Sequence, residues 1–478
     1  MHPRMSLALV VVVFFGALNV SAAEKKSSIL PPSADQVLAR QLFQELVNIN
    51  TTHANGSTAA AQLIAKRLLA GGFAPADVTV IAPTDKPTKA NVVVRYRAKP
   101  SRAAALAPVL VLGHLDVVEA KAEDWSFNPF VYRENDGWLY GRGTIDMKDG
   151  DAAALAGLLR LKREGFVPDR DLIVAFTADE EAGGDANGPA FLLKEHRELV
   201  DADLVLNLDG GGGALKHGER LYFEIGTSEK TYSTYTIEAT SPGGHGSLPG
   251  PDNAIYRVTH ALDRLSAFRF PVMLTTTTRA AFAASAAFEP PAIAADLRAV
   301  AAVNPDLAAA ERLSDTVRLN AELRTTCVAT LISGGHAENA LPQRAKATIQ
   351  CRMMPGDTTE HVTEQLAKTL DDPQLTLKLD APPIVSPESV PTPQLMGRLA
   401  TVVHSMWPSV PLIPAMATGF SDDRQTRNAG IPSYDVSGIW SEVDENRAHG
   451  RDERVNARAF DESVEYTYRL LKMMSQHE

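Results

Sequence analysis

Three short apolar runs constrain this chain most, because each one leads directly into acidic or imidazole side chains. Residues 109–112 are followed by Gly-His-Leu-Asp, residues 172–176 by Thr-Ala-Asp-Glu-Glu, and residues 204–206 by Asn-Leu-Asp-Gly-Gly. Runs of this length and composition are typical of buried strands. Open α/β sheets gather their ligands at the carboxyl ends of strands. We therefore expect the polar ends of the three runs to meet at one place.

The order of the patterns along the chain predicts two domains, one inserted in the other. Strand and helix patterns alternate up to residue 226, which is typical of a mostly parallel sheet covered by helices. From about residue 227 the strand patterns alternate as in half-exposed sheets, and this predicts a small α+β insert. We place the catalytic domain at 24–226 and 385–478 and the insert at 227–384. Residues 275–324 have little clear period and allow either a helical hairpin or an extended excursion.

The first 23 residues have the pattern of a cleaved export signal. Arg4 precedes an apolar stretch at residues 7–18, and small residues follow at 20–23. The stretch is shorter than the roughly 20 residues that a bilayer span requires, so a membrane anchor is less favoured. We expect an exported protein, periplasmic or secreted, with no membrane attachment after cleavage.

The net charge limits the kinds of partner that the protein can bind, and the cysteine content limits the possible disulfides. The formal net charge of the 478 residues is −11, which argues against a polyanion partner such as nucleic acid. Cys327 and Cys351 are the only cysteines. In an exported protein they could pair, but two buried free thiols fit the sequence equally well.

The acidic and imidazole residues indicate a binuclear metal site. A divalent ion held by imidazole and carboxylates, without thiolate, keeps a coordinated water and favours hydrolysis. His114 and Asp116 stand two apart on one side of a strand end, while the adjacent Glu180 and Glu181 can take separate roles. Taken singly, each of these residues has a plainer explanation. His114 and Asp116 could lie in a surface turn, and Glu180 and Glu181 at the acidic start of a helix. Asp146 could be a solvated loop aspartate, and His449 an exposed loop histidine. Only the whole set favours a metal site.

Six motifs, in order, resemble one family of zinc exopeptidases and deacylases, which includes aminoacylase, carboxypeptidase S, carboxypeptidase G, carnosine dipeptidase and succinyl-diaminopimelate desuccinylase. They are Gly-His-Leu-Asp-Val-Val at 113–118, Gly-Arg-Gly-Thr-Ile-Asp-Met-Lys at 141–148, Thr-Ala-Asp-Glu-Glu at 177–181, Asn-Leu-Asp-Gly-Gly at 207–211, Gly-Gly-His-Gly-Ser at 243–247 and His-Gly-Arg-Asp-Glu-Arg at 449–454. The resemblance implies two Zn²⁺ ions, with Co²⁺ or Mn²⁺ as substitutes. It implies one ion on His114 and Asp209, a second on Glu181 and His449, and Asp146 bridging both.

The same resemblance implies roles for the remaining residues. Glu180 is expected to be the general base, and Asp116 to orient His114 from behind. The insert is expected to be a ferredoxin-like lid that forms a homodimer, with His245 reaching the partner's active site to assist the oxyanion. Three further residues are expected to meet the substrate: Arg352, Asn339 and Ser421. The peptide bond from Asp146 to Met147 is expected to be cis.

Two positions depart from the family pattern. The family often has glycine where this chain has Asp149, and its loop near Ser421 often reads Gly-Gly-Thr-Asp, where this chain has Gly-Phe-Ser-Asp. Neither departure touches an expected metal ligand, so what they put in doubt is the substrate preference.

The sequence therefore predicts an exported binuclear zinc metallopeptidase that acts on dipeptides or on the C-terminal residue of short peptides. An N-acyl-amino-acid deacylase is the alternative, because it breaks the same kind of amide with the same atoms. A catalytically silent binding protein on this fold is a further alternative, against which the retention of Glu180 and all five expected ligands counts.

Overall fold

The computed structural model describes residues 28–99, 106–182, 184 and 186–477. The predicted export signal at 1–23 lies outside the described residues. Within the described part of the chain, none of the helices combines the length and apolar character needed to cross a membrane.

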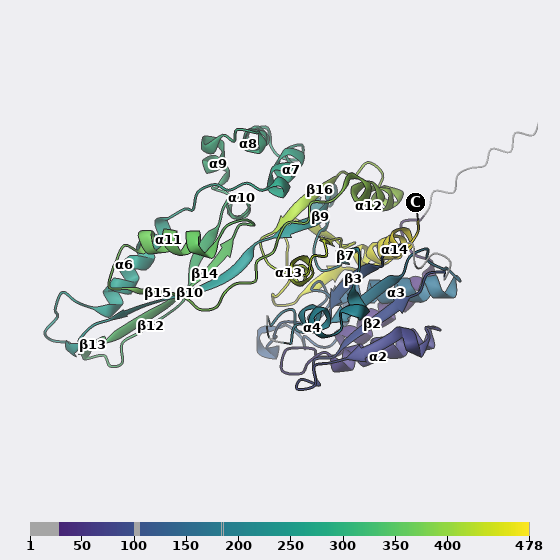
Figure 1. The fold of residues 1–478 in the computed structure, drawn as a ribbon, viewed down its shortest axis with the longest axis horizontal. Helices are drawn as coiled ribbons and strands as arrows, with labels where there is room; N and C mark the ends of the chain where they lie inside the picture. Colours follow the sequence, from purple (N-terminus) through teal and green to yellow (C-terminus); the bar gives the residue numbers. More distant parts are fainter. Residues whose placement is uncertain (1–27, 100–105, 183, 185, 478) are drawn as a thin grey trace, which may run out of the picture.

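A large mixed sheet forms the centre of the molecule (Figure 1). The apolar runs of the sequence are its central strands. Strands β3 and β6 are buried along their whole length and β7 from Val205 on, as burial of both faces in a parallel sheet requires. One half of the sheet contains β1 (Val78–Ile81), β2 (Asn91–Tyr96), β6 (Leu172–Thr177), β3 (Val109–His114), β7 (Leu204–Asn207) and β17 (Ser433–Asp435), in that order. Strands β6, β3, β7 and β17 run parallel, so their carboxyl ends share one edge.

The sheet continues through four further strands. These are β9 (Glu219–Glu229), β8 (Gly212–Lys216) and β18 (Trp440–Glu442), with β16 (Leu412–Ala417) pairing in parallel with β9. A separate three-stranded sheet contains β19 (Arg454–Asn456), β5 (Trp138–Tyr140) and β4 (Arg133–Asn135).

Helices cover both faces of the large sheet, because successive strand residues point to opposite faces. Val92, Val111 and Val174 pack under α1 (Ser33–Val47), α2 (Thr58–Ala70), α3 (Lys148–Arg163), α12 (Pro393–Met406) and α14 (Ala457–Met474). Leu110 and Ile173 pack on the other face, against the layer with α4 (Gly188–Glu195) and α5 (Arg197–Val200). The short helix α13 (Asp423–Asn428) contacts α4. Two 3₁₀ turns complete this part, at Pro75–Asp77 and Ala122–Asp124.

A four-stranded antiparallel sheet extends away from the large one (Figure 1). Its order is β12 (Thr326–Gly334), β14 (Arg344–Met353), β10 (Thr231–Thr240) and β15 (Thr376–Leu379), with α6 (Ala254–Ala267) and α11 (Thr359–Leu370) packed on one face. A two-stranded ladder of β11 (Gly244–His245) and β13 (Ala340–Leu341) lies beside it. This arrangement confirms the predicted fold class of a mostly parallel α/β sheet with a separate small sheet. Lys230 alone separates β9 of the large sheet from β10 of the small one.

The region with little clear period folds as four helices with a core of their own. They are α7 (Thr276–Ser285), α8 (Pro291–Ala301), α9 (Leu307–Leu313) and α10 (Val317–Leu323). Helix α7 contacts β16 and β9, so this cluster rests on the large sheet. The two cysteines, left open by the sequence, are joined in a disulfide between directly opposed positions of β12 and β14.

Candidate metal centre

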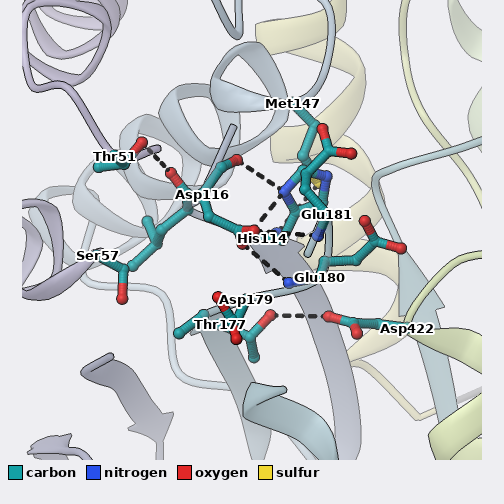
Figure 2. Close-up of polar contacts among 12 residues, drawn as sticks. Thr51, Ser57, His114, Asp116, Met147, Thr177, Asp179, Glu180, Glu181 and Asp422 are labelled. Carbon is teal, nitrogen blue, oxygen red and sulfur yellow. Dashed lines mark hydrogen bonds and ion pairs between the residues drawn. The ribbon is translucent and has the colours of Figure 1, made fainter. Parts of the chain in front are cut away.

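Five of the predicted site residues meet at one edge of the large sheet. His114 ends β3, Glu180 and Glu181 follow β6, and Asp209 follows β7. Because β3 pairs in parallel with both β6 and β7, these ends lie side by side. Figure 2 shows His114, Asp116, Glu180 and Glu181 together at this edge. The polar ends of the three apolar runs therefore meet in the structure, as the sequence predicted.

Asp146 and His449 arrive from loops that a second pairing brings together. The loop with Asp146 follows β5, and the loop with His449 precedes β19. Strands β5 and β19 pair with Tyr140 opposite Arg454, so the two loops leave the ladder at the same point. This explains how a histidine so far along the chain joins the strand-end cluster.

The first group of possible metal ligands surrounds His114, a buried side chain with 2% exposure. Its Nε2 lies 3.1 Å from Oδ1 of Asp146 and 3.4 Å from Oδ1 of Asp209. Its Nδ1 lies 3.0 Å from the backbone carbonyl oxygen of Asp116. A hydrogen bond from Nδ1 to that carbonyl fixes the tautomer that leaves the Nε2 lone pair free for an ion.

The second group surrounds His449. Its Nε2 lies 3.0 Å from Oδ2 of Asp146 and 3.0 Å from Oε2 of Glu181. One oxygen of Asp146 therefore faces His114 and the other faces His449. This is the arrangement that a carboxylate bridging two ions needs, and each of the two groups has ligand atoms close enough to share one ion.

The charges of the two groups suit cations. Although burial opposes it, hydrogen bonds to His114 and His449 lower the pKa of Asp146, so this carboxylate stays ionised. Hydrogen bonds to Asp146 and Glu181 raise the pKa of His449 to about 10. The carboxylates of Asp146, Asp209 and Glu181 share one partly buried site, and three carboxylates carry more negative charge than two imidazoles can offset. Imidazole and carboxylate donors without thiolate fit two zinc ions, which His114 and Asp209, Glu181 and His449, and Asp146 would hold.

Glu453 fixes the loop that carries Asp146. This fully buried carboxylate accepts hydrogen bonds from the backbone N–H groups of Gly143 at 3.1 Å and Ile145 at 2.9 Å, and from Nη1 of Arg142 at 2.5 Å. Nη2 of Arg142 donates to the backbone carbonyl of His449 at 3.3 Å. The pair therefore ties both ligand loops together, a role that the sequence reasoning missed although both residues lie inside the quoted motifs. The bond from Asp146 to Met147 is cis, as expected.

Asp116 holds the acidic pair rather than the imidazole of His114. Its carboxylate accepts the backbone N–H groups of Glu180 at 3.1 Å and Glu181 at 3.0 Å, whereas Nδ1 of His114 lies 3.7 Å from the nearer oxygen. Glu180 is 4% exposed, and its Oε1 has no hydrogen-bond partner in the described part of the chain. Burial raises the pKa of Glu180 well above its ordinary value. A carboxylate in this state is suited to take up a proton.

Two buried acids near Glu180 were not identified from the sequence. Asp422 accepts hydrogen bonds from Oγ1 of Thr177 at 3.1 Å and from Nδ2 of Asn187 at 2.6 Å, and burial raises its pKa to about 7 (Figure 2). Asp179 accepts a hydrogen bond from Nζ of Lys89 at 2.5 Å. Asp179 lies in the motif at 177–181 and Asp422 in the segment Gly-Phe-Ser-Asp at 419–422. Their positions in these segments are the only signal in the sequence that could have identified them.

The residues predicted on the small sheet do not join the cluster within this chain. His245 and Asn339 are exposed and neighbour each other, with the N–H of Gly246 donating to the Asn339 carbonyl at 2.8 Å. Figure 1 places β13, which pairs with the strand of His245, at the end of the small sheet remote from β3 and β7. Ser421 lies at the junction of the domains, where its N–H donates to Oε2 of Glu229 at 2.5 Å.

Arg352 also lies at the junction of the domains, because it pairs with Tyr232 at the start of β10. Its guanidinium carbon is 4.8 Å from the ring centroid of Tyr232 and 5.4 Å from that of Phe420.

Known proteins share this sequence pattern and this fold. The model of peptidase family M20/M25/M40 matches residues 110–473. The N-fatty-acyl-amino acid synthase/hydrolase PM20D1 of Xenopus tropicalis is 28% identical over 77% of this chain and 72% of its own length. Probable carboxypeptidase S-like 2 of Dictyostelium discoideum is 27% identical over the same shares. Among solved structures, human carnosine dipeptidase 1 aligns with a TM-score of 0.64 at 15% identity, over 93% of this chain and 97% of its own. The di-peptidase Dug1p of Saccharomyces cerevisiae aligns with a TM-score of 0.67 at 16% identity, over 92% and 96%.

Proposed function

The chain belongs to peptidase family M20/M25/M40, metallo-hydrolases of peptide and amide bonds, and we propose that it is an exported binuclear zinc exopeptidase. In this proposal it releases an amino acid from a dipeptide or from the carboxyl end of a short peptide. The observation that carries the proposal is Asp146, whose two oxygens face His114 and His449, together with Oε1 of Glu180, which has no hydrogen-bond partner among the described residues.

Each residue of the site has a separate role in amide hydrolysis. Two bound zinc ions would polarise the scissile carbonyl and lower the pKa of the attacking water. Glu180 takes a proton from that water and gives it to the nitrogen of the leaving amine. Asp116 keeps Glu180 and Glu181 in place through their backbone N–H groups, and Glu453 keeps Asp146 in place. The raised pKa of Glu180 suits both halves of this proton transfer.

The second candidate is hydrolysis of N-acyl amino acids. It is favoured by the relatives of this chain, since N-fatty-acyl-amino acid synthase/hydrolases are among the most similar proteins, beside the carboxypeptidase S-like one. Both reactions break an amide with the same atoms, and only the pocket for the acyl or aminoacyl side differs. Substrate choice therefore has to be measured.

A substrate panel tests the proposal. The zinc-loaded protein without its first 23 residues is incubated with dipeptides, short peptides and N-acyl amino acids, and released amino acid is measured, with Glu180→Gln as the control. Release from dipeptides or peptides that Glu180→Gln abolishes supports the exopeptidase, and release from acyl substrates alone transfers the assignment to the deacylase. Release from none of them would support a silent binding protein.

Export and dimerisation belong to the same proposal. The disulfide between Cys327 and Cys351 favours an oxidising compartment. Strand β12 is an edge of the small sheet and exposes Val328, Leu331 and Ile332, an apolar edge suited to pairing with a second copy. In such a homodimer His245 would reach the partner's metal centre. Light scattering of the protein at micromolar concentration tests the dimer.

A further inference from the structure

A cavity of about 550 Å³ opens beside the loops that carry two of the metal ligands. Strand β5 contributes Trp138 to its wall, β18 contributes Trp440, and β19 contributes Arg454. Ile145, the residue before Asp146, also lines it. The wall includes none of the five expected metal ligands, so the cavity is separate from the place where an amide would be cleaved. Its volume lies within the range of roughly 300–1,000 Å³ that small-molecule sites have.

Part of the wall is apolar. Trp440 is 3% exposed and Val455 is 1% exposed, while Trp138 and Leu215 are half-buried around the same space. Apolar surface that faces a cavity gains free energy when an apolar group replaces the water beside it. The cavity therefore suits a ligand with an apolar body.

The charged part of the wall has an excess of one positive charge. Four arginines and three glutamates line the cavity: Arg220, Arg447, Arg454, Arg458, Glu442, Glu445 and Glu462. This local excess contrasts with the net charge of −11 of the whole chain. The cavity is therefore electrostatically suited to a small anion.

Glu462, in α14, is shared by two of these arginines. It is buried, and it accepts hydrogen bonds from Nη2 of Arg220 at 2.6 Å and from Nε of Arg458 at 2.9 Å. One carboxylate offsets only one of the two positive charges. In the described part of the chain, Nη1 of Arg220 makes no hydrogen bond. Since a guanidinium has several N–H donors, Arg220 has donors left for an anion in the cavity.

Glu445 is shared in the same way, on the loop that carries His449. Nη2 of Arg454 donates a hydrogen bond to Oε1 of Glu445, and Nε of Arg447 lies 3.3 Å from the same oxygen. Arg447 precedes His449 by two residues. A ligand held by these guanidinium groups would therefore contact the loop of a metal ligand.

Two of the arginines are held in place by the tryptophans of the wall. The guanidinium carbon of Arg454 is 3.9 Å from the ring centroid of Trp138, and that of Arg220 is 5.0 Å from the ring centroid of Trp440. Stacking on an aromatic ring fixes a guanidinium plane, and donors in fixed positions lose less entropy when they bind an anion.

We infer that this cavity binds a small organic acid, a carboxylate on a compact apolar body. The carboxylate accepts hydrogen bonds from the guanidinium groups of Arg220 and Arg447, and such bonds between charged groups are stronger than those of a neutral amide. The apolar body packs between Trp138 and Val455. The site lies outside the metal centre, so the inference does not depend on which amide the enzyme cleaves.

The experiment is a calorimetric titration of the zinc-loaded protein without its first 23 residues. Its ligands are 3-phenylpropionate, 3-phenylpropionamide, which has the same body without the charge, and acetate, which has the charge without the body. The wild type is compared with Arg220→Gln and Arg447→Gln, because each change leaves the shared glutamate one arginine partner. Thermal melting of each variant checks folding.

Arg197→Gln is the matched control. Arg197, in α5, also pairs with an acid, Asp201 at 2.9 Å, but lies outside the cavity. This variant therefore loses the same charge at another place, and it should bind 3-phenylpropionate as tightly as the wild type.

We expect 3-phenylpropionate to bind about 10-fold more weakly to Arg220→Gln and to Arg447→Gln, because one hydrogen bond between charged groups contributes about this factor. The amide should bind the wild type about 10-fold more weakly than the acid, for the same reason. Acetate should bind about 100-fold more weakly, since it lacks the apolar contact. Equal affinity of acid and amide for the wild type would overturn the inference.

Carboxylates can also bind to the zinc ions, and the variants separate the two places. A ligand that bound only at the metal centre would have the same affinity for the wild type and every variant, and this result would refute the cavity site. Hydrogen exchange of the ligand-saturated wild type is the second measurement, and it decides the matter if the glutamine variants do not fold. It should show protection at residues 440–447 and 454–459, whereas protection confined to residues 114–116 and 207–209 would contradict the inference.

A free acid and the carboxyl end of a peptide share this chemistry. The titration is therefore repeated in Glu180→Gln protein, which leaves peptides intact, with 3-phenylpropionate and with N-acetyl-alanyl-phenylalanine. The ligand whose affinity falls more when Arg220→Gln is added identifies the source, and we expect the free acid. No fall for either ligand would overturn the site. Neither binding nor hydrogen exchange requires turnover, so failure of the hydrolase proposal leaves this test intact.

Discussion

The large sheet and the small sheet present their chemical residues in opposite ways. At the strand ends of the large sheet, His114, Glu180 and Asp116 are buried and fixed by hydrogen bonds within one chain. At the far end of the small sheet, His245 and Asn339 are exposed, and β13, which pairs with the strand of His245, lies remote from β3 and β7 (Figure 1). The first group is held within one chain, whereas the second would act in catalysis only if another surface brought it to a metal centre.

The difference follows from how each is positioned. Parallel pairing of β3, β6 and β7 brings strand ends together without help from side chains. No such pairing acts on the β11 and β13 ladder, which is joined to the rest through the small sheet. Residues held by the sheet should therefore determine whether the enzyme works at all, and residues of the ladder should determine how well an assembled enzyme works.

The largest expected effect is at the strand ends. Glu180→Gln should reduce kcat by about 1,000-fold while zinc content stays unchanged, because removal of a general base costs roughly 10²–10⁴-fold. Steady-state kinetics together with metal analysis of the same sample check this. The exposed Glu119→Gln serves as the control and should behave as wild type. A Glu180→Gln protein with more than a tenth of the wild-type rate would remove Glu180 from the mechanism.

The next effect concerns the stability of the small sheet. The disulfide closes a loop with a sequence separation of 24 residues, so the double change Cys327→Ala and Cys351→Ala should destabilise this domain by about 3 kcal/mol. Denaturant unfolding followed by hydrogen exchange of β10 and β14 measures the loss. Zinc affinity should not change, since the metal centre is built on the other sheet. A parallel loss of zinc affinity would show that the two regions unfold as one unit.

A mixing experiment tests whether the ladder acts on a partner. His245→Ala should lower kcat by about 100-fold, the usual effect of losing an oxyanion donor. Mixed with inactive Glu180→Gln protein, it should recover about a quarter of wild-type activity, because half of the dimers are hybrids and each hybrid has one intact site. Recovery that is absent in freshly mixed and in re-equilibrated samples would place His245 outside the partner's site.

The sequence predicted most where backbone pattern alone decides position. Residues 109–112, 172–176 and 204–206 are continuous apolar runs, so their burial and the meeting of His114, Glu181 and Asp209 could be predicted from them. The cis bond after Asp146 came from the resemblance and is present. The sequence did not predict the separate helices α7 to α10, because short alanine-rich helices that pack mainly on each other have weak periodicity.

What the sequence could not give are contacts that depend on tertiary geometry. The carboxylate of Asp116 was expected behind His114, but it accepts the N–H groups of Glu180 and Glu181, a choice that depends on the turn after β6. Likewise, no spacing rule relates Glu453 to Gly143 or Arg142 to His449, because these pairs come from distant segments that meet only in the folded protein. The motifs contained these residues without indicating their partners.

The last prediction concerns how well water is excluded from the layer beneath the metal centre. Asp149, at the start of α3, is buried, and its Oδ1 has no hydrogen-bond partner in the described part of the chain. Burial raises its pKa to about 8, so the folded protein keeps this proton up to that pH, whereas the unfolded chain releases it near pH 4. The contribution to stability is therefore complete below about pH 4 and is lost as the pH rises toward 8, by about 1.4 kcal/mol per pH unit.

Asp149→Asn lacks this proton, so the difference in free energy of unfolding between variant and wild type should grow in favour of the variant from pH 5 to pH 7. Urea unfolding at several pH values measures this difference in the free energy of unfolding. If the free energies of variant and wild type change with pH in parallel, water or a cation reaches Asp149. Burial beneath the strand ends would then be less complete than the contrast between the two sheets requires.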